Sequence, residues 1–330
     1  MHPKSFSDLM RLAHGFESAK IFLVANDLGL FRLVGEGSTA GVLAETLQLD
    51  ERALGILLNA LVALGLLEAD GQTFKNTHLG RTYLASEDRR ESIFKHIHRC
   101  WESWNNLADV LCHGQPDEVR EEQFLHNTQD WNREFIRGME DVTRDLAPQV
   151  VSKLKLTSPR HLLDLGGGPG VYAKAFLQCY PELEKVTIFD LPMAIDIAKE
   201  RLDGYQRIGN VRFSEGDFRY DHIGSGYDII WISQIFHSQD ERGCQKLIDK
   251  AWNALLPGGT VYIHDFLLDD TKMAPVSAAI FAVHMLVMTE RGRTYTGSEI
   301  GTWLEERGFI DVFQDVVSEE TAIVAAVKPS

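Results

Sequence analysis

The pattern of apolar and polar residues changes near Arg160. From there on, short apolar and β-branched runs (RHLLDL, EKVTIFD, NVRFSEGD, YDIIWIS and GTVYIHDFLL) alternate with helically spaced segments such as PMAIDIAKERL and ERGCQKLIDKAWNALL. This alternation predicts a parallel sheet with helices on both of its faces. At the end, only SEE separates FIDVFQDVV from TAIVAAVK. Because a parallel crossover needs about a dozen residues or more, these last two strands are predicted to form an antiparallel hairpin.

The first part of the chain has a mainly helical pattern. We expect a helix from about Ala40, a turn near Asp50, a second apolar helix up to Leu64, and a hairpin turn at the Asp-Gly of LLEADGQTF. This order predicts a winged-helix fold, which often reads DNA. Here acidic residues outnumber basic ones in residues 1–90, and the helix that would enter a groove, ERALGILLNALVALG, is almost wholly apolar. Because a DNA reader needs basic contacts, we predict that this surface is buried against another subunit.

The chain is therefore predicted to have three parts and to belong to the α/β class. Residues 1–100 are expected to form a winged-helix dimerisation domain, and residues 101–155 a helical linker that contributes to a ligand pocket. Residues 156–330 are expected to form a Rossmann-like domain, mostly parallel with a C-terminal antiparallel hairpin. His96 and His98 lie two residues apart, which directs them to different faces of a helix, so no metal site is predicted.

Composition excludes several classes of protein. The chain has 330 residues, of which 44% are hydrophobic and 25% charged, as expected of a globular protein. No apolar run approaches the roughly 20 residues of a membrane span, and the N-terminus lacks the order of a secretory signal, so we expect a cytoplasmic protein. The four cysteines show no C-x-x-C spacing, which argues against disulfides and thiolate metal sites. The net charge of −15 opposes a nucleic-acid partner and favours a small molecule.

The stretch LLDLGGGPGVYAKAFL contains the clearest candidate for a ligand site. Gly166, Gly168 and Gly170 form a G-x-G-x-G turn between the first predicted strand and a helix. Val171 stands where a dinucleotide-binding fingerprint has its third glycine, which disfavours an NAD-dependent dehydrogenase. The turn alone is equally compatible with a nucleotide-like ligand and with tight strand-to-helix packing.

Two aspartates at the following strand ends favour the ligand. Asp190 ends the second strand about twenty residues later, where a carboxylate can accept both hydroxyls of a ribose. Asp217 follows the third strand, where it can accept a hydrogen bond from an adenine amino group while Phe218 packs on the ring. Either aspartate alone is more often a turn or a helix cap, but the ordered set predicts a nucleoside site.

The run DLGGGPG, followed by FDLP, GDF, ISQIFHSQDE, LLPGGTVYIHDFLLDD and the closing hairpin, resembles the class I S-adenosylmethionine-dependent O-methyltransferases. It is similar to the type shared by plant phenolic, animal hydroxyindole, and bacterial polyketide and carotenoid methyltransferases. The resemblance covers nearly the whole chain and implies S-adenosylmethionine as cofactor and a homodimer that exchanges helices of the N-terminal domain. The cofactor-binding residues that it implies are Gly166, Gly168, Gly170, Asp190, Leu191, Asp217, Phe218 and Ser233.

The resemblance also implies a general base. His237, in ISQIFHSQDE, matches the catalytic histidine of that family, and imidazole suits the removal of a proton from a phenol, whose pKa is about 10. Asp265 occupies the position of the first acid that orients this histidine, where the family usually has the longer Glu. At the second acid the chain departs from the pattern, because RGRTYT places Thr294 where a Glu is expected and Glu290 is out of register.

The acceptor is expected to be small, flat and apolar, with a phenolic, quinol or polyketide-like hydroxyl. Helically spaced aromatic and Met residues would line its pocket over His237, although the same spacing is typical of a plain core. These candidates are Trp131, Phe135, Met139, Phe281, His284, Met285 and Met288.

Three alternatives to O-methyl transfer stay open at this point. The missing second acid at Thr294 leaves room for a relative that binds the cofactor but catalyses hydroxylation or decarboxylation, or that has lost activity. An NAD-dependent dehydrogenase has the wrong glycine pattern. A transcriptional regulator, the non-enzymatic alternative, lacks the basic charge that it would need.

Overall fold

The computed structural model separates the chain into two compact units, Met1–Trp101 and Glu102–Ser330. The residues that it describes are 3–86, 90–116, 129–156, 159–318 and 320–330. Within this part of the chain, no helix combines the length and the apolar character that crossing a membrane requires.

The first unit is helical with a small antiparallel sheet in the order β1-β3-β2. Its second predicted helix begins where the sequence indicates, because the Asp50 side chain accepts the Ala53 N–H at 2.7 Å as an N-cap. The hairpin β2–β3 follows directly, which completes the order of a winged helix. The elements are α1 (Phe6–Asp27), α2 (Leu30–Val34), β1 (Ser38–Thr39), α3 (Ala40–Leu47), α4 (Glu51–Ala63), β2 (Leu67–Asp70), β3 (Thr73–Asn76), α5 (His78–Gly80), a π-helical turn (Arg81–Ala85) and α6 (Glu91–Asn105), whose residues from Glu102 on belong to the second unit.

The expectation that α4 presents its apolar residues to another subunit is wrong for the face of that helix that packs in its own unit. Leu54, Leu58 and Leu61 are at most 3% exposed and pack in the core of their own unit. These leucines recur at helical spacing and form the apolar face through which α4 packs on the core of its unit. Ile56 of α4 and Leu64 after its last residue stay exposed, and a larger group of exposed apolar side chains lies on α1, at Phe6, Leu9, Met10, Leu12 and Phe16.

The second unit contains a seven-stranded sheet in the order β11-β12-β8-β7-β4-β5-β6. Strands β4 to β8 pair in parallel, whereas β12 is antiparallel to both β8 and β11. The predicted parallel sheet and closing hairpin are therefore confirmed. The elements are α7 (Leu107–His113), α9 (Gln129–Lys153), β4 (His161–Leu165), α10 (Val171–Cys179), β5 (Lys185–Asp190), α11 (Pro192–Leu202), β6 (Val211–Glu215), β7 (Tyr227–Ser233), α12 (Glu241–Ala254), β8 (Leu255–Asp265), β9 (Leu267–Leu268), α13 (Val276–Met288), β10 (Tyr295–Thr296), α14 (Gly297–Arg307), β11 (Ile310–Val316) and β12 (Ala322–Val327), with 3-10 turns at Ile208–Asn210 and Phe236–Ser238.

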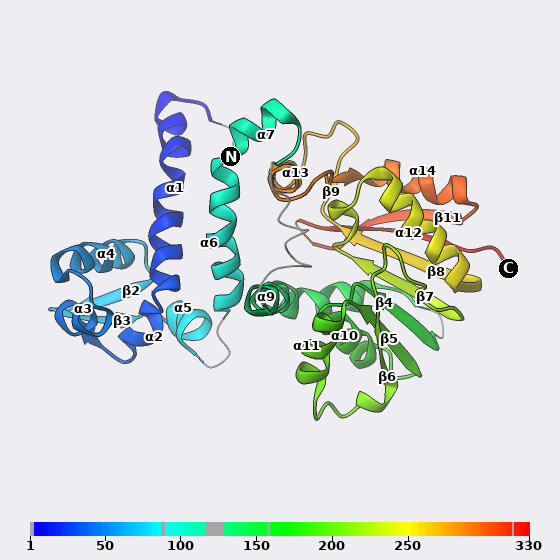
Figure 1. Ribbon diagram of the computed structural model, residues 1–330, viewed down its shortest axis with the longest axis horizontal. Coiled ribbons are helices and arrows are strands. Elements are labelled where there is room, and N and C mark those ends of the chain that lie inside the picture. Colours follow the sequence, from blue (N-terminus) through cyan, green and yellow to red (C-terminus); the bar gives the residue numbers. More distant parts are fainter. Residues whose placement is uncertain (1–2, 87–89, 117–128, 157–158, 319) are drawn as a thin grey trace. The chain divides into compact units, whose positions relative to one another are not determined.

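Helices cover both faces of this sheet, with α10 and α11 on one side and α12 and α14 on the other (Figure 1). Side chains alternate between the two cores along each strand. In β7, Ile230 and Ile232 face the core with α12 and α14, whereas Ile229 and Trp231 face the core with α9 and α10. Because both faces are buried, the central strands are mostly apolar, with Asp164 in β4 and His264 in β8 as buried polar exceptions, and such runs are the pattern that predicts a parallel sheet.

Candidate active site

The glycine turn follows β4 at the point where the strand order changes direction. β5 pairs on one side of β4 and β7 on the other, and ligands of open α/β sheets bind at such a point. Gly166 has φ +70°, and a Cβ there would lie 2.5 Å from Cδ1 of Ile235. Gly168 has φ +51°, and apart from its two chain neighbours no described residue has a heavy atom within 4 Å of where its Cβ would be. The turn is therefore tight at Gly166, while Gly168 has room beside it. Gly170 caps the N-terminus of α10.

Asp190 ends β5 and binds the glycine turn through its carboxylate. Its Oδ2 accepts the Gly168 N–H at 2.8 Å, and its Oδ1 accepts the Leu191 N–H at 2.7 Å. Burial raises the pKa of Asp190 to about 6, with a smaller contribution from the charge of Asp217, although the two N–H bonds act in the opposite direction. A carboxylate has about four acceptor sites, so this one can still accept the two hydroxyls of a ribose.

Asp217 has an additional partner that the sequence pattern did not suggest. Its carboxylate accepts the Arg219 backbone N–H at 2.9 Å and the Arg219 guanidinium at 2.7 Å. Partial burial acts to raise the pKa of Asp217, but the bonds from Arg219 outweigh it and the pKa is lowered. The carboxylate is therefore ionised at neutral pH. Phe218 packs partly on the core, and its ring lies 3.7 Å from the position that a Cβ of Gly166 would take.

Ser233 at the end of β7 bonds into a buried polar network. Its Oγ lies 2.9 Å from Nδ1 of His264, whose Nε2 lies 2.8 Å from Oγ1 of Thr321. The Tyr172 hydroxyl also lies 3.3 Å from that Nδ1. Burial lowers the pKa of His264 to about 4, so its ring is neutral at neutral pH. Any bond from Ser233 to a ligand would therefore be additional to the bond with His264.

His237 and Asp265 form a tight pair. Nδ1 of His237 lies 2.6 Å from Oδ1 of Asp265, and the His237 backbone N–H donates to Oδ2 at 3.2 Å. The Phe266 N–H donates to Oδ1 at 2.8 Å, and Asp265 is only 2% exposed. Because an ionised carboxylate can only accept, Nδ1 carries a proton. The lone pair of the neutral imidazole therefore lies on Nε2, and this nitrogen can accept a proton.

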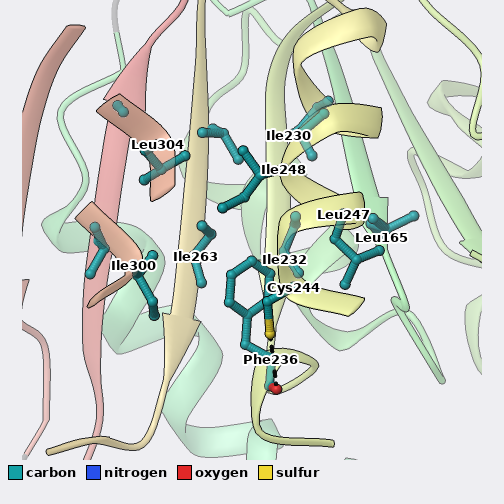
Figure 2. Packing of buried hydrophobic residues seen from close by; sticks show 14 of the residues in the cluster. Leu165, Ile230, Ile232, Phe236, Cys244, Leu247, Ile248, Ile263, Ile300 and Leu304 are labelled. Carbon is teal, nitrogen blue, oxygen red and sulfur yellow. Dashed lines mark hydrogen bonds between the residues drawn. The ribbon is translucent and has the colours of Figure 1, made fainter. Parts of the chain in front are cut away.

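The hydrophobic core fixes the short turn that carries His237. Phe236, directly before it, is 1% exposed and packs against Ile232 and the helix α12 (Figure 2). Cys244 of α12 also donates through Sγ to the carbonyl of Phe236, with a distance of 3.5 Å. The position of the imidazole thus depends on buried packing as well as on Asp265.

The loop before β10 packs on this turn without supplying a second acid. A Cβ at Gly292 would lie 2.5 Å from the His237 carbonyl, and the Tyr295 hydroxyl donates to the Gln239 carbonyl at 2.7 Å. Thr294 is 2% exposed and donates to the Ala278 carbonyl at 3.4 Å. Glu290 is exposed and lies 3.6 Å from Arg291. Among the described residues, Asp265 is the acid that contacts His237.

A pocket of about 300 Å³ lies beside these residues, against the helix α13. Phe281 and Phe266 form part of its wall, and both rings also contact His237, with centroids 4.9 Å and 6.2 Å from the imidazole. His237 itself does not line the pocket; the two Phe rings connect it to the lining. The described lining residues are Trp104, Phe266, Ser277, Ile280, Phe281, His284 and Glu320.

The other predicted acceptor residues lie apart from this lining. Met285 and Met288 are 6% and 8% exposed and are buried on α13. Phe135 and Met139 are half-buried on α9. The side chain of Trp131 lies outside the part of the chain that the structure describes.

Comparison with known proteins places these features in a family. Residues 104–310 match the O-methyltransferase domain, and residues 10–86 match the O-methyltransferase dimerisation domain. The chain belongs to the O-methyltransferase family. This confirms the resemblance to class I S-adenosylmethionine-dependent O-methyltransferases that the sequence motifs carry.

Individual relatives of this O-methyltransferase match over most of their length. The 3-hydroxy-5-methyl-1-naphthoate 3-O-methyltransferase of Streptomyces sahachiroi is 31% identical over 310 residues, which cover 92% of this chain and 89% of that protein. Acetylserotonin O-methyltransferase of Bos taurus is 28% identical over 327 residues, 94% of each chain. The chain is thus similar to enzymes that act on different hydroxylated ring systems.

Solved structures show the same fold. An O-methyltransferase family protein from Burkholderia thailandensis matches with a TM-score of 0.89 and 28% identity, over 100% of this chain and 99% of that one. Human N-acetylserotonin methyltransferase, solved in complex with S-adenosylmethionine, matches with a TM-score of 0.88 and 23% identity over the same shares. The predicted fold, a class I methyltransferase sheet with a helical N-terminal region, is confirmed.

Sequence reasoning missed several residues of this O-methyltransferase's candidate site. Ile235 and Phe266 are neighbours of His237 and Asp265 in the chain, so the motif positions could have drawn attention to both. Trp104 has no local signal, because it meets His284 across 180 positions of sequence. Arg219 could have been found as a basic residue two positions after Asp217.

Proposed function

We propose that this O-methyltransferase transfers the methyl group of S-adenosylmethionine to a hydroxyl of a small, flat, apolar acceptor, with His237 as the general base. The observation that carries the proposal is the His237–Asp265 pair. It fixes the imidazole tautomer that leaves Nε2 free to take a proton, beside an aromatic pocket.

The residues at the strand ends fit the cofactor. Room beside Gly168, together with the remaining acceptor sites of Asp190, suits a ligand that carries ribose hydroxyls. The apolar ring of Phe218 suits a purine, and Asp217 would share its carboxylate between Arg219 and an adenine amino group. Ser233 would add a hydroxyl at the end of β7. When bound, S-adenosylmethionine supplies an electrophilic methyl group on a sulfonium sulfur.

His237 would accept the acceptor's proton on Nε2 as the hydroxyl oxygen attacks. Asp265 would keep the proton on Nδ1 in place and stabilise the positive charge that the imidazole gains. Because the backbone N–H groups of His237 and Phe266 also bind this carboxylate, the acid does not need to reorganise during the reaction. Proton removal by a positioned base is worth about 10²–10⁴-fold in rate.

The nature of the acceptor follows from the pocket and the relatives. Phe266, Phe281 and Trp104 give the pocket aromatic walls, which suits a flat ring. Relatives are named for a naphthoate and for acetylserotonin, both of which carry a hydroxyl on an aromatic ring system. We infer a phenolic hydroxyl as the methylated group.

Replacement of the base tests the proposal. In His237→Ala, methyl transfer to a panel of phenols and quinols should fall by about 10²–10⁴-fold, whereas cofactor affinity in calorimetry should stay close to parental. The rate should recover partly at high pH, where the phenol ionises without help. His222→Ala, which removes an exposed histidine, is the matched control. A parental rate in His237→Ala would make the base assignment wrong, and loss of cofactor binding would make His237 a structural residue.

We also infer that the chain forms a homodimer through its first unit. The five exposed apolar side chains of α1 lie in a region that partly overlaps the matched dimerisation domain, and monomers rarely leave such a surface in water. Sedimentation equilibrium should give twice the chain mass, and Phe16→Glu should weaken the association. Val42→Glu, at another exposed apolar residue, should have less effect. A soluble parental monomer at micromolar concentration would overturn the inference.

A further inference from the structure

His284 on α13 is held in one tautomer by Trp104. The indole Nε1–H of Trp104 donates to Nδ1 of His284 at 3.1 Å, and the two rings stack with centroids 6.1 Å apart at 25°. An indole nitrogen can only donate, so Nδ1 of His284 is an acceptor and carries no proton. The proton of the neutral ring must therefore lie on Nε2.

The ring of His284 is neutral under ordinary conditions. Burial, with a smaller contribution from the nearby imidazole of His237, lowers its pKa to about 4. Within the described residues, no side chain or backbone group accepts a bond from its Nε2–H, and the residue lines the pocket. His284 thus offers the pocket a neutral hydrogen-bond donor.

The two histidines beside the pocket have opposite roles in hydrogen bonding. Phe281 contacts both of them, with its centroid 4.9 Å from the His237 imidazole and 5.7 Å from that of His284. Asp265 puts the proton of His237 on Nδ1 and leaves Nε2 as an acceptor. Trp104 leaves Nδ1 of His284 as an acceptor and so puts the ring proton on Nε2. A flat molecule in the pocket would meet the donor of His284 directly, and it would reach the acceptor of His237, which does not line the pocket, by extending past Phe266 and Phe281.

The charge of the pocket restricts its ligand further. Among the described lining residues, Glu320 is the acid and there is no Lys or Arg. Ser277 adds a hydroxyl, and the remaining walls are apolar. A carboxylate on the ligand would lose hydration without gaining a cation, and it would face the charge of Glu320.

We propose that His284 selects the acceptor, and that the natural acceptor is a neutral aromatic compound with a ketone, aldehyde, ester or amide oxygen that accepts the Nε2–H bond while its hydroxyl lies at His237. This inference rests on the proposed O-methyl transfer. It narrows the substrate class to hydroxyaryl carbonyl compounds and excludes free hydroxyaryl carboxylates.

Matched acceptors test the selection. Each series consists of three naphthols with the hydroxyl at the same ring position. They differ at one other ring position, which carries hydrogen, a formyl group or a carboxylate. For the parental enzyme, we expect kcat/KM for the formyl compound to exceed that for the unsubstituted naphthol by about 3–10-fold, mainly through KM, as one hydrogen bond allows. The carboxylate should be the poorest of the three. Calorimetry with S-adenosylhomocysteine present should give the same order of affinity.

Variants of His284 separate this inference from the proposed function. In His284→Phe the ratio of formyl to unsubstituted naphthol should fall towards one, whereas His284→Asn, whose amide can still donate, should keep part of the preference. Trp104→Phe, which releases the tautomer, should lower the ratio as well. A parental ratio in His284→Phe, or preference for the carboxylate, overturns the inference while transfer itself stands. Absence of methylation of every naphthol and phenol would instead count against the proposed function, and the inference would fall with it.

Discussion

Asp190 and Asp265 end two strands of one sheet, but their carboxylates are satisfied in different ways. Asp265 receives the imidazole of His237 and two backbone N–H groups. Asp190 receives backbone N–H groups from Gly168 and Leu191. A side chain thus occupies the first carboxylate, whereas the second has acceptor sites left for a ligand. One residue type at the same edge of a sheet can therefore orient a base or bind a ligand, depending on what its neighbours donate.

The largest expected effect comes from Asp265→Asn. The amide would donate to Nδ1 of His237 and move the ring proton to Nε2, the nitrogen that must accept. We expect methyl transfer to fall by about 10²–10⁴-fold with little change in cofactor affinity. Single-turnover rates and calorimetry measure the two quantities. Asp265→Glu, which keeps a carboxylate, should retain more activity; equal losses in both variants would contradict the tautomer argument.

Replacement of the other aspartate should act on binding instead. Asp190→Ala removes the proposed ribose acceptor and leaves the Gly168 and Leu191 N–H groups unpaired. Cofactor binding should weaken by about 10–150-fold, which corresponds to roughly 1.5–3 kcal/mol. The exposed acid Asp196 on α11 offers a control, because Asp196→Ala should leave calorimetric affinity close to parental. If Asp190→Ala lowers kcat at saturating cofactor and spares affinity, the contrast between the two carboxylates is wrong.

The pH dependence of cofactor binding should be the smallest of these effects. The raised pKa of Asp190, about 6, means that the folded protein holds this proton to higher pH than the unfolded chain does. Its burial therefore lowers the free energy of unfolding as pH rises from about 4 to 6. Affinity for S-adenosylhomocysteine should run the other way, falling as pH drops through 6 by at most about tenfold per unit, because ribose hydroxyls prefer the ionised carboxylate.

Asp190→Asn tests this dependence, since its amide does not titrate and the slope below pH 6 should shrink. Asp164, which is 1% exposed and accepts the Ala173 N–H at 3.1 Å, also has a raised pKa, about 7, from burial. A slope centred near pH 7 that persists in Asp190→Asn would identify Asp164 as its source. A flat parental profile between pH 5 and 7 would contradict the assignment to either group.

Most of the fold could be predicted because its signals are local. The strands β4, β5 and β7 are short, mostly apolar runs, and Asp50 marks the start of α4 through a cap that a sequence shows directly. The exposed face of α1 could not be predicted in the same way. Its apolar residues resemble those of a buried helix, and only packing decides that Phe6 and Phe16 stay outside the core of their unit.

The candidate site likewise contains residues that local sequence signals predict and residues that only tertiary packing brings together. His237, Asp265 and Asp190 are tied to strand ends, so the order of motifs predicts that they lie at one edge of the sheet. The bond between Trp104 and His284 joins two helices that are distant in the chain, and no periodicity marks it. The hydrogen bond between Ser233 and His264 could not be predicted for another reason. The sequence of an apolar strand does not indicate which neighbouring side chain its histidine will contact.

Gly166 and Gly168 should resist substitution for different reasons. At Gly166 the obstacle is steric as well as conformational, because Cδ1 of Ile235 occupies the place of a methyl group. A smaller residue at 235 could therefore restore part of what Gly166→Ala loses. At Gly168 the obstacle is backbone conformation alone, so no change in a neighbour can help, whereas Asn, which adopts positive φ more readily, should be accepted best. In a library of double variants, position 166 should depend on residue 235 and position 168 should be independent of it.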